Sequence, residues 1–259
     1  MTDLIAIAER LDQAAFTARA TPQLIEPMDV AGAYEVQKLS MARRYARGET
    51  RIGVKMGLTS RAKMAQMGVE EVIWGRLTDK MLVEDGASIN RHAFVHPRVE
   101  PEIAFLIDKP LAGDVTPMAA LAAVAGIAPA LEIIDSRYEN FKFSLTDVIA
   151  DNSSSSALVV GPWADPAIDF GNLGMVVRID GHVKLIGSSA AILGHPIRSL
   201  VVAARLAAAA GEPLKPGDIV LAGGATAAEA LSPGQHVKLS VEALGSVEFK
   251  VEQEKQANP

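Results

Sequence analysis

Two glutamates lie close together in the segment VEPEIAF, residues 99–105. Apolar residues alternate with others in this segment, which predicts a β-strand. Because side chains two positions apart share one face of a strand, Glu100 and Glu102 would stand side by side, opposite the apolar residues. Like charges on one strand face repel each other, so either water screens the pair or a cation holds the two carboxylates together.

Glu132 is a third carboxylate in an unusual place, within the apolar segment APALEIID, which has the character of a central strand. An unpaired ionised carboxylate buried there would be costly. Three carboxylates, in a chain without cysteine and with only His92 and His96 nearby, suit a hard ion such as Mg²⁺ or Mn²⁺ better than zinc. The alternative is a buried glutamate that pairs with Arg98 or Arg137.

Lys55 lies in the apolar segment GVKMG, flanked by two glycines. Its ammonium could extend to water, or it could be buried beside an anionic substrate, where it would donate a proton or a strong hydrogen bond. Asp79, in GRLTDKM, could be its partner or a separate acid–base group, although an aspartate in an exposed turn is an ordinary feature. We predict Lys55 and Asp79 as the catalytic residues.

Three further segments offer groups that could bind a substrate carboxylate. They are the polar run ADNSSSS at 150–156, the sequence GHP at 194–196 and the segment AGGATAA at 222–228. Each also has an ordinary explanation as a polar turn, a helix start or a loop. The residues predicted to bind substrate are Ser156, His195 and Thr226.

Composition limits the class of protein. The chain has 259 residues, of which 49% are hydrophobic and 22% charged, enough to bury a substantial core. A net charge of −6 and an aromatic content of 5% argue against a nucleic-acid partner. The absence of cysteine excludes disulfides, thiolate zinc sites and a cysteine nucleophile.

The N-terminal segment and the apolar stretches bear on location. Asp3 and Glu9 are interspersed among apolar residues at helical spacing, unlike the basic region and apolar run of a signal peptide. The most apolar stretches are short and interrupted by charged residues or proline, so no membrane span is expected. We expect a cytoplasmic protein.

Hydrophobic periodicity predicts the elements that must position these residues. Helices are expected at 3–19, 30–47, 116–126, 140–149 and 197–210, and after Ser60 in RAKMAQMGV. Strands are expected in RIGVKMGLTS (51–60) and at 81–84, 99–107, 129–135, 156–161, 173–180, 182–188, 218–222, 236–242 and 246–252. Asp180-Gly181 and Leu244-Gly245 mark tight turns.

Strands outnumber helices after residue 80 without a regular alternation of the two, so an α+β fold with a mixed or antiparallel sheet is expected rather than a doubly wound one. We predict a single catalytic domain over 1–259. It would comprise a helical N-terminal region of about 1–50, a β-rich metal-binding core of about 51–253 and a flexible tail at 254–259.

Several motifs together resemble a known family. They are GVKMGLTSRAKMAQMGV, VEPEIAF, PALEIIDSRYENFKF, VIADNSSSS, LGHP and LAGGATAA, and they extend over nearly the whole chain. In this combination they resemble the hydratase and decarboxylase group of the fumarylacetoacetate hydrolase superfamily. Within that group, KMGLTSRAKMAQMG and IDSRYENFKF are more similar to the decarboxylases.

The resemblance implies that Glu100, Glu102 and Glu132 hold Mg²⁺ or Mn²⁺. It also implies a roll of mixed sheets around the site, a helical N-terminal region and a homo-oligomer. Lys55 matches the lysine of the family pattern K-x-G-L-T-S, and Asp79 lies close to the position of an active-site aspartate. Hydratase-like sequences place that aspartate one residue later, where this chain has Lys80.

The activity implied by the resemblance is decarboxylation of 2-oxo-3-hexenedioate to 2-hydroxypenta-2,4-dienoate and CO₂, in the meta-cleavage degradation of catechols and other aromatics. Alternatives are hydration of 2-hydroxypentadienoate, hydrolysis of a C–C bond, or a non-catalytic role as an assembly subunit bound to a hydratase. The chemistry of decarboxylation favours a comparatively apolar pocket for the leaving carboxylate, because a tight salt bridge stabilises the ground state more than the transition state. This argues against a direct contact with Arg137 or Lys142.

Overall fold

The computed structural model describes residues 3–25, 28–60, 64 and 72–253. The helix expected after Ser60 and the tail expected at 254–259 therefore lie, wholly or for the most part, outside the described residues. The helices are α1 (Leu4–Thr17), α2 (Val30–Ala46), α4 (Pro117–Leu121), α5 (Leu145–Ala150) and α6 (Pro196–Ala209). Single 3-10 turns are η1 (Asp79–Met81), η2 (Arg91–Ala93), η3 (Glu139–Phe141), η4 (Asn152–Ser154) and η5 (Ser189–Ala191).

The strands form two sheets, and all of them lie after residue 50. They are β1 (Arg51–Gly57), β2 (Ile73–Thr78), β3 (Leu82–Val83), β4 (Ser88–Ile89), β5 (Arg98–Ile107), β6 (Val124–Ile134), β7 (Ser155–Val160), β8 (Gly174–Ile179), β9 (His182–Ser188), β10 (Ile219–Leu221), β11 (Glu229–Ala230), β12 (His236–Val241) and β13 (Gly245–Val251).

The larger sheet carries the order β2-β1-β10-β5-β6-β7-β3, with β11 paired to the start of β5. Its pairs β1–β10 and β3–β7 are parallel and the others are antiparallel. The smaller sheet has the order β4-β13-β12-β8-β9 and contains one parallel pair, β13–β4. The expectation of a mixed α+β fold is therefore confirmed.

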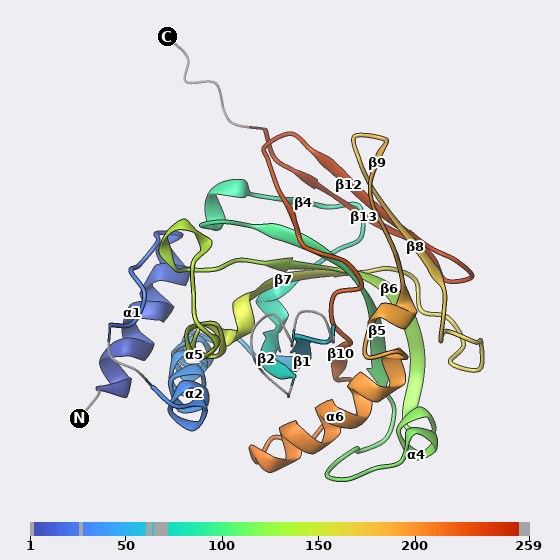
Figure 1. The fold of residues 1–259 in the computed structure, drawn as a ribbon, viewed down its shortest axis with the longest axis horizontal. Helices are drawn as coiled ribbons and strands as arrows, with labels where there is room; N and C mark the ends of the chain where they lie inside the picture. The colour runs from blue at the N-terminus through green and yellow to red at the C-terminus, as the bar shows by residue number, and fades with distance from the viewer. Residues whose placement is uncertain (1–2, 26–27, 61–63, 65–71, 254–259) are drawn as a thin grey trace.

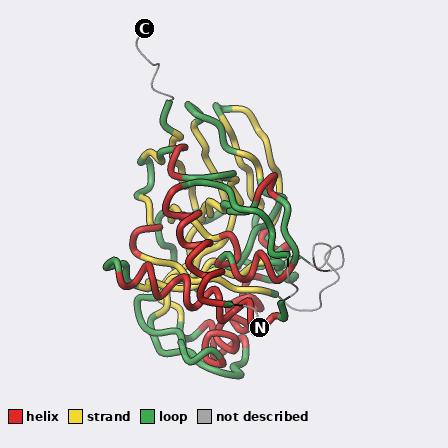
Figure 2. The backbone as a smooth tube through the Cα atoms, turned by 90° about the vertical axis from the view of Figure 1, so that its left-hand side faces the viewer, coloured by secondary structure: helices red, strands yellow, loops and turns green. Residues whose placement is uncertain are grey.

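The two sheets pack against each other through β6, β12 and β13. Phe105, Ile127 and Phe249 are completely buried in the core that fills the space between them. In Figure 1 the smaller sheet lies at the upper right, α6 and α4 lie below the strands, and α1, α2 and α5 group at the left. Viewed from the side of α1 and α2, the strands extend above most of the helices (Figure 2).

The N-terminal helices are joined to each other by buried charge. Asp12 of α1 is almost fully buried and accepts hydrogen bonds from Arg43 and Arg47 at the end of α2. A second apolar cluster includes Leu11, Val36 and Ile149, so α5 packs with this pair of helices. Asp3 and Asp29 begin α1 and α2, where each side chain accepts a backbone N–H of the first turn.

Several boundaries differ from those expected. The strands β2, β4 and β11 were not expected from the sequence, and the helix expected at 116–126 ends at Leu121 because Val124 already begins β6. The segment 124–128 is rich in Ala and Gly, but its pairing with β5 overrides that composition. The helix expected at 140–149 begins only at Leu145, because Asn140 and Phe141 adopt left-handed backbone conformations.

Candidate active site

Three glutamates meet where β5 pairs with β6. Glu100 and Glu102 lie two positions apart on β5, and antiparallel pairing sets Glu132 of β6 directly opposite Glu100. Each of the three offers a carboxylate oxygen, and these atoms lie within 4.8 Å of one another. Glu102 and Glu132 are fully buried, whereas Glu100 keeps 8% of its surface exposed. The expected gathering of these three carboxylates is thus present in the fold.

Lys55 reaches the same cluster from β1. Its Nζ lies 3.0 Å from Glu132 Oε2 and donates a hydrogen bond of 3.0 Å to the carbonyl oxygen of Ser153. Burial alone would lower the pKa of Lys55, but the carboxylates of Glu132, Glu100 and Glu102 outweigh burial and raise it. Lys55 is therefore an ammonium, and it is Lys55 rather than Arg98 or Arg137 that pairs with Glu132.

The cluster carries an excess of buried negative charge. Burial first, and then repulsion from Glu132, raises the pKa of Glu102 well above its ordinary value, and burial also raises the pKa of Glu132. Glu102 Oε1 and Glu132 Oε1 are buried and accept no hydrogen bond. One lysine cannot balance three carboxylates, so an oxygen-preferring divalent cation fits this donor set.

Two glycines of the segment AGGATAA support the glutamates. The backbone N–H of Gly223 donates a hydrogen bond of 2.6 Å to Glu102 Oε2. Gly223 has a φ of +109°, and a Cβ at this position would lie 2.1 Å from Thr59 Oγ1. A Cβ on Gly224 would lie 2.9 Å from Glu100 Cδ. Only glycines let this segment approach the carboxylates so closely.

The Ser153 carbonyl that faces Lys55 belongs to an unusual turn. Asn152, Ser153 and Ser154 all have positive φ, so the chain turns sharply between α5 and β7. Asp151, just before them, is fully buried and forms an ion pair with Arg137, whose backbone N–H it also accepts. Burial raises the pKa of Asp151 to about 6, although Arg137 acts in the opposite direction. The Arg137–Asp151 pair thereby helps to hold the turn that meets Lys55.

A cavity of about 480 Å³ opens above the cluster. Its polar lining includes Lys55, Glu100, Arg98, Ser153 and Ser154. The remaining walls are mostly apolar and comprise Gly57, Leu58, Ile73, Ile134, Phe141, Phe143, Val148, Ala227 and Ala228. A small organic anion that reached the carboxylate cluster would thus be surrounded mainly by hydrocarbon.

Asp79 does not join this site. It follows β2 in η1, where it accepts the backbone N–H of Thr50 at 2.8 Å, and that hydrogen bond lowers its pKa. Lys55 pairs with Gly75, four residues earlier on β2. At about 3.3 Å per residue, Asp79 is more than 10 Å along the strand from Lys55. The structure therefore places Asp79 in a turn away from Lys55, so the two residues are not partners, and a separate acid–base role for Asp79 stays a prediction.

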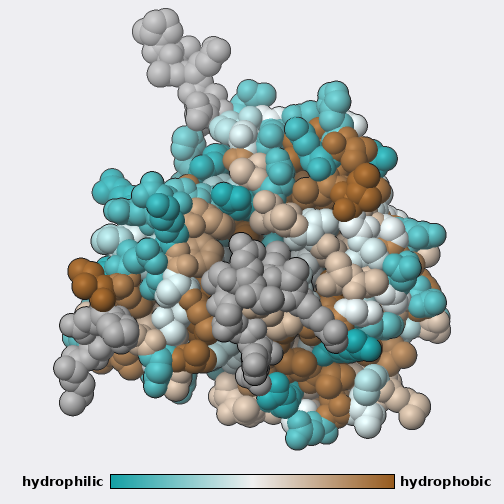
Figure 3. Space-filling model, in the orientation of Figure 1, coloured by the Kyte–Doolittle hydropathy of each residue, from teal (hydrophilic) through white to brown (hydrophobic). Residues whose placement is uncertain are grey.

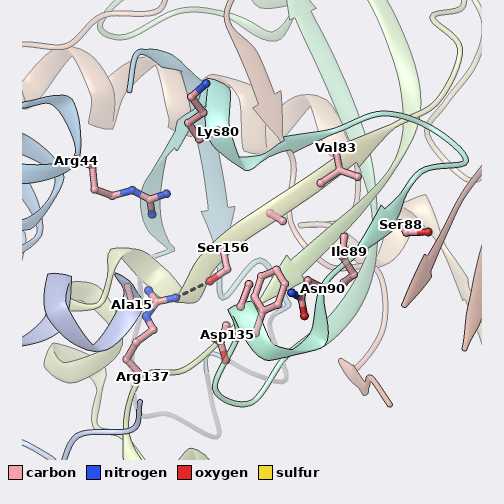
Figure 4. Close-up of a pocket in the computed structure, with 13 residues that line it drawn as sticks. Ala15, Arg44, Lys80, Val83, Ser88, Ile89, Asn90, Asp135, Arg137 and Ser156 are labelled. Carbon is pink, nitrogen blue, oxygen red and sulfur yellow. Dashed lines mark hydrogen bonds between the residues drawn. The ribbon is translucent and has the colours of Figure 1, made fainter. Parts of the chain in front are cut away.

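Ser156 lies in a different cavity, of about 280 Å³, which shares no lining residue with the one above the glutamates. Figure 4 shows Ser156 turned toward Arg137, which donates a hydrogen bond to its Oγ. Arg44 and Lys80 line the same cavity. Among the serines of ADNSSSS, the cavity above the glutamates is lined by Ser153 and Ser154 instead.

His195 and Thr226 also lie outside the described lining of the cavity. His195 precedes α6, its Nδ1 accepts the backbone N–H of Ile197, and its ring packs edge-on against Phe170. Thr226 donates a hydrogen bond to the carbonyl oxygen of Ala227. Only its neighbours Ala227 and Ala228 line the cavity. The structure therefore gives His195 a helix-capping position and puts Thr226 beside the site.

Replacing Glu102 with glutamine is expected to stabilise the metal-free protein and to weaken Mg²⁺ binding. The unfolded chain releases the Glu102 proton at a lower pH than the folded chain, so wild-type stability falls as pH rises toward the raised pKa, by about 1.4 kcal/mol for each pKa unit. Glutamine keeps the shape without the charge. Thermal unfolding between about pH 5 and pH 8 should show a variant whose advantage over wild type grows with pH.

The same variant has a second measurable property. Titration calorimetry should show weaker Mg²⁺ binding by Glu102→Gln than by wild type, because one carboxylate is lost. A variant that binds Mg²⁺ as tightly as wild type, or that unfolds at a lower temperature at pH 8, would contradict this description of Glu102.

Comparison with known proteins agrees with the fold. Residues 53–252 match the family described as fumarylacetoacetate (FAA) hydrolase C-terminal. The chain is 58% identical to a 4-oxalocrotonate decarboxylase of Pseudomonas sp, over 94% of this chain and 96% of that protein. It is 34% identical to a 2-hydroxyhexa-2,4-dienoate hydratase of Comamonas testosteroni, over 93% of this chain and 95% of that protein.

A solved structure has the same fold throughout. The 4-oxalocrotonate decarboxylase from Pseudomonas putida G7, complexed with magnesium and adipate, is 38% identical, with a TM-score of 0.92 and coverage of 96% of this chain and 97% of that one. This similarity includes the N-terminal helices as well as both sheets. The chain therefore belongs to the fumarylacetoacetate hydrolase C-terminal family, as the resemblance in its sequence motifs implied.

Proposed function

We propose that this protein decarboxylates 2-oxo-3-hexenedioate (4-oxalocrotonate) to 2-hydroxypenta-2,4-dienoate and CO₂, in the meta-cleavage degradation of aromatics. The observation that carries the proposal is the cluster of Glu100, Glu102, Glu132 and Lys55, of which Lys55 and Glu100 line a largely apolar cavity. The 58% identity to a 4-oxalocrotonate decarboxylase supports the same reaction. The whole of 1–259 would act as a single catalytic domain.

We assign the metal site to Glu100, Glu102 and Glu132. Their oxygens are close enough to share one ion, and buried Glu102 Oε1 and Glu132 Oε1 lack hydrogen-bond donors. An all-oxygen site suits Mg²⁺ or Mn²⁺. When bound, the ion would supply Lewis-acid stabilisation of the negative charge that develops on the 2-keto oxygen.

The bond changes in this reaction require the protein to stabilise a negative charge on the C2 oxygen of the substrate. The C5–C6 bond breaks, its electron pair forms the C4=C5 double bond, and the displaced electrons form the C2=C3 double bond and leave a negative charge on the C2 oxygen. That oxygen then takes up one proton from solvent to give the 2-hydroxy group of the product. The ammonium of Lys55 lies at the cluster and can donate a hydrogen bond to that oxygen. The Ser153 carbonyl oxygen and Glu132 fix its direction, so Lys55 needs no rearrangement during the step.

The walls of the cavity favour departure of the carboxylate. Ile73, Ile134, Phe143 and Val148 give the cavity apolar walls, which suit a group that changes from a charged carboxylate to neutral CO₂. Arg137 is bound to Asp151 and does not line this cavity, and neither does exposed Lys142. This arrangement agrees with the expectation that neither residue grips the leaving group.

Hydration of 2-hydroxypenta-2,4-dienoate is the alternative, because hydratases are also relatives of this chain. That reaction must activate a water molecule with a positioned base. Purified protein with Mg²⁺ should be given 2-oxo-3-hexenedioate and, separately, 2-hydroxypenta-2,4-dienoate. We expect one CO₂ for each 2-oxo-3-hexenedioate consumed and persistence of the diene. Loss of the diene without CO₂ release from the first substrate would support the hydratase instead.

We further propose that the protein forms a homo-oligomer, and that this assembly can bind a 2-oxopent-4-enoate hydratase. Exposed apolar side chains support this, among them Ile186 at 75% and Val183 at 50% on β9, at the edge of the smaller sheet. Figure 3 shows hydrophobic surface over this region. Burial of such surface between subunits would be favourable.

Light scattering at micromolar concentration tests the assembly, and a mass above the 27.3 kDa of one chain is expected. A monomer mass would contradict the homo-oligomer, and an unchanged mass after addition of a hydratase would contradict the mixed complex. No described helix is long and apolar enough to cross a membrane. A cytoplasmic location stays a prediction from the sequence, which cell fractionation tests.

A further inference from the structure

Arg98 begins β5 on the same strand face as Glu100 and Glu102, because the three residues are spaced two apart. It lines the cavity together with Glu100, and pairing sets it opposite Ile134, another lining residue. Glu102 is fully buried, Glu100 is slightly exposed and Arg98 is partly exposed. The face of β5 thus runs from the fully buried Glu102, through Glu100 at the cavity, to the partly exposed Arg98.

The guanidinium of Arg98 is held in place by an aromatic ring. Its Cζ lies 4.1 Å from the centroid of the Phe141 ring, and Phe141 also lines the cavity. Phe141 is itself packed edge-on against Phe143 and His96. A guanidinium that stacks on an aromatic face is attracted to the ring, and the N–H donors at the edge of the guanidinium stay available.

Arg98 differs in this respect from the two most buried arginines near the site. Arg137 forms an ion pair with Asp151, and Arg76 forms one with Glu212. Within the described part of the chain, no hydrogen bond or ion pair joins the Arg98 guanidinium to a carboxylate. A planar guanidinium with free donors in a substrate cavity is suited to binding a carboxylate with two parallel hydrogen bonds.

The spacing along β5 matches the length of the proposed substrate. Alternate residues of a strand lie about 7 Å apart, which separates Arg98 from Glu100 by roughly the length of an extended six-carbon chain. A 2-oxo dicarboxylate whose C1 end lies at the glutamates would therefore direct its C6 carboxylate toward Arg98. A monocarboxylate of the same length would leave this cation without a partner.

We propose that Arg98 is the specificity-determining residue that recognises the distal carboxylate of a six-carbon 2-oxo dicarboxylate. This inference rests on the proposed function for the orientation of the substrate. The contact forms in the enzyme–substrate complex and disappears as the carboxylate becomes neutral CO₂, so Arg98 strengthens substrate binding and, by stabilising the ground state, slows the chemical step. Arg98 selects diacids over monoacids, while the apolar walls favour loss of the carboxylate.

Two stable ligands test the selection without turnover. 2-Oxohexanedioate and 2-oxohexanoate share the 2-oxo acid end, differ in the distal carboxylate, and lack the double bond through which decarboxylation proceeds. Titration calorimetry with Mg²⁺-loaded wild type should show binding of the diacid that is roughly tenfold to a hundredfold tighter. Arg98→Met should abolish this preference and leave the affinity for 2-oxohexanoate unchanged.

Matched variants separate recognition from general charge effects. Lys142→Met removes an exposed positive charge from the neighbouring loop and should keep the wild-type preference. Arg98→Lys keeps the positive charge but lacks the planar guanidinium, so it should retain part of the preference for the diacid. If Arg98→Met fails to fold, Arg98→Gln takes its place beside Arg98→Lys. An undiminished preference for the diacid in the folded neutral variant would overturn the proposal.

The kinetic consequence is a split between KM and kcat. With 2-oxo-3-hexenedioate, Arg98→Met should raise KM by roughly tenfold to a hundredfold and should raise kcat rather than lower it, because the lost contact stabilises only the enzyme–substrate complex. A fall in kcat at unchanged KM would contradict a role in recognition. Failure of the proposed decarboxylation is distinguishable, because wild type would then release no CO₂ and yet keep its preference for 2-oxohexanedioate.

Discussion

Replacing Lys55 with methionine is expected to lower turnover of 2-oxo-3-hexenedioate by about a hundredfold or more, the scale of a lost oxyanion donor. The ammonium of Lys55 lies 3.0 Å from Glu132 and would donate a hydrogen bond to the charged C2 oxygen. Methionine is similar in length and apolar, so it fills the space without donating. Steady-state CO₂ release by metal-loaded protein measures the effect.

The same substitution has different effects on the metal-free and metal-loaded forms. Without a metal, loss of Lys55 leaves buried Glu132 without its cationic partner, so the unfolding temperature should fall. With Mg²⁺ or Mn²⁺ present, the ion compensates the carboxylates, and the fold should be nearly as stable as wild type. Lys109→Met, at an exposed position beyond the end of β5, is the control and should behave as wild type. Near wild-type turnover in folded, metal-loaded Lys55→Met would remove Lys55 from the mechanism.

Removal of the metal is expected to abolish turnover entirely. Chelation with EDTA should leave a folded but inactive protein. Burial raises the pKa of Glu102 and Glu132, so these carboxylates can take up protons when no cation is present. Addition of Mg²⁺ or Mn²⁺ should restore CO₂ release and raise the unfolding temperature, because the ion binds the folded state alone.

Two controls make the metal experiment decisive. Circular dichroism of the chelated protein should match that of the untreated protein, and Glu132→Gln should stay inactive when the metal is returned. Full activity in a preparation shown to be metal-free by elemental analysis would contradict the role assigned to the three glutamates.

The sequence was informative where a local rule determines the result. The two-residue period of a strand places Glu100 and Glu102 on one face of β5, and in the structure both carboxylates meet Glu132 on that face. The apolar neighbours of Glu132 predicted a buried carboxylate, and it is fully buried. Both conclusions depend on residues adjacent in the chain.

Properties that depend on distant pairing could not be read in the same way. Glu132 faces Glu100 only because of the register between β5 and β6, and Lys55 reaches them because β10 lies between β1 and β5. The turn at Asn152–Ser154 has three positive φ values, so Ser153 rather than Ser156 meets Lys55. No local pattern indicated this turn, although the run ADNSSSS marked the segment.

The binding partner proposed for Arg98 depends on the fold and could not be predicted from the sequence. The sequence offered it as a partner for a buried glutamate, but Lys55 takes that place. Its position over Phe141 depends on the left-handed conformation of Phe141, in a segment for which a helix was expected. The register of β5 and the path of the chain near residue 141 together decide what Arg98 can bind.

The central claim is that one divalent cation is shared by Glu100, Glu102 and Glu132. A crystal structure of the protein soaked with Mn²⁺, with diffraction recorded at the manganese absorption edge, tests it directly. We expect one strong anomalous peak at about 2.1–2.2 Å from a carboxylate oxygen of each glutamate, near the distances of hard divalent ions of this size. An absent peak, or a peak elsewhere in a preparation that releases CO₂ at full rate, would contradict the claim.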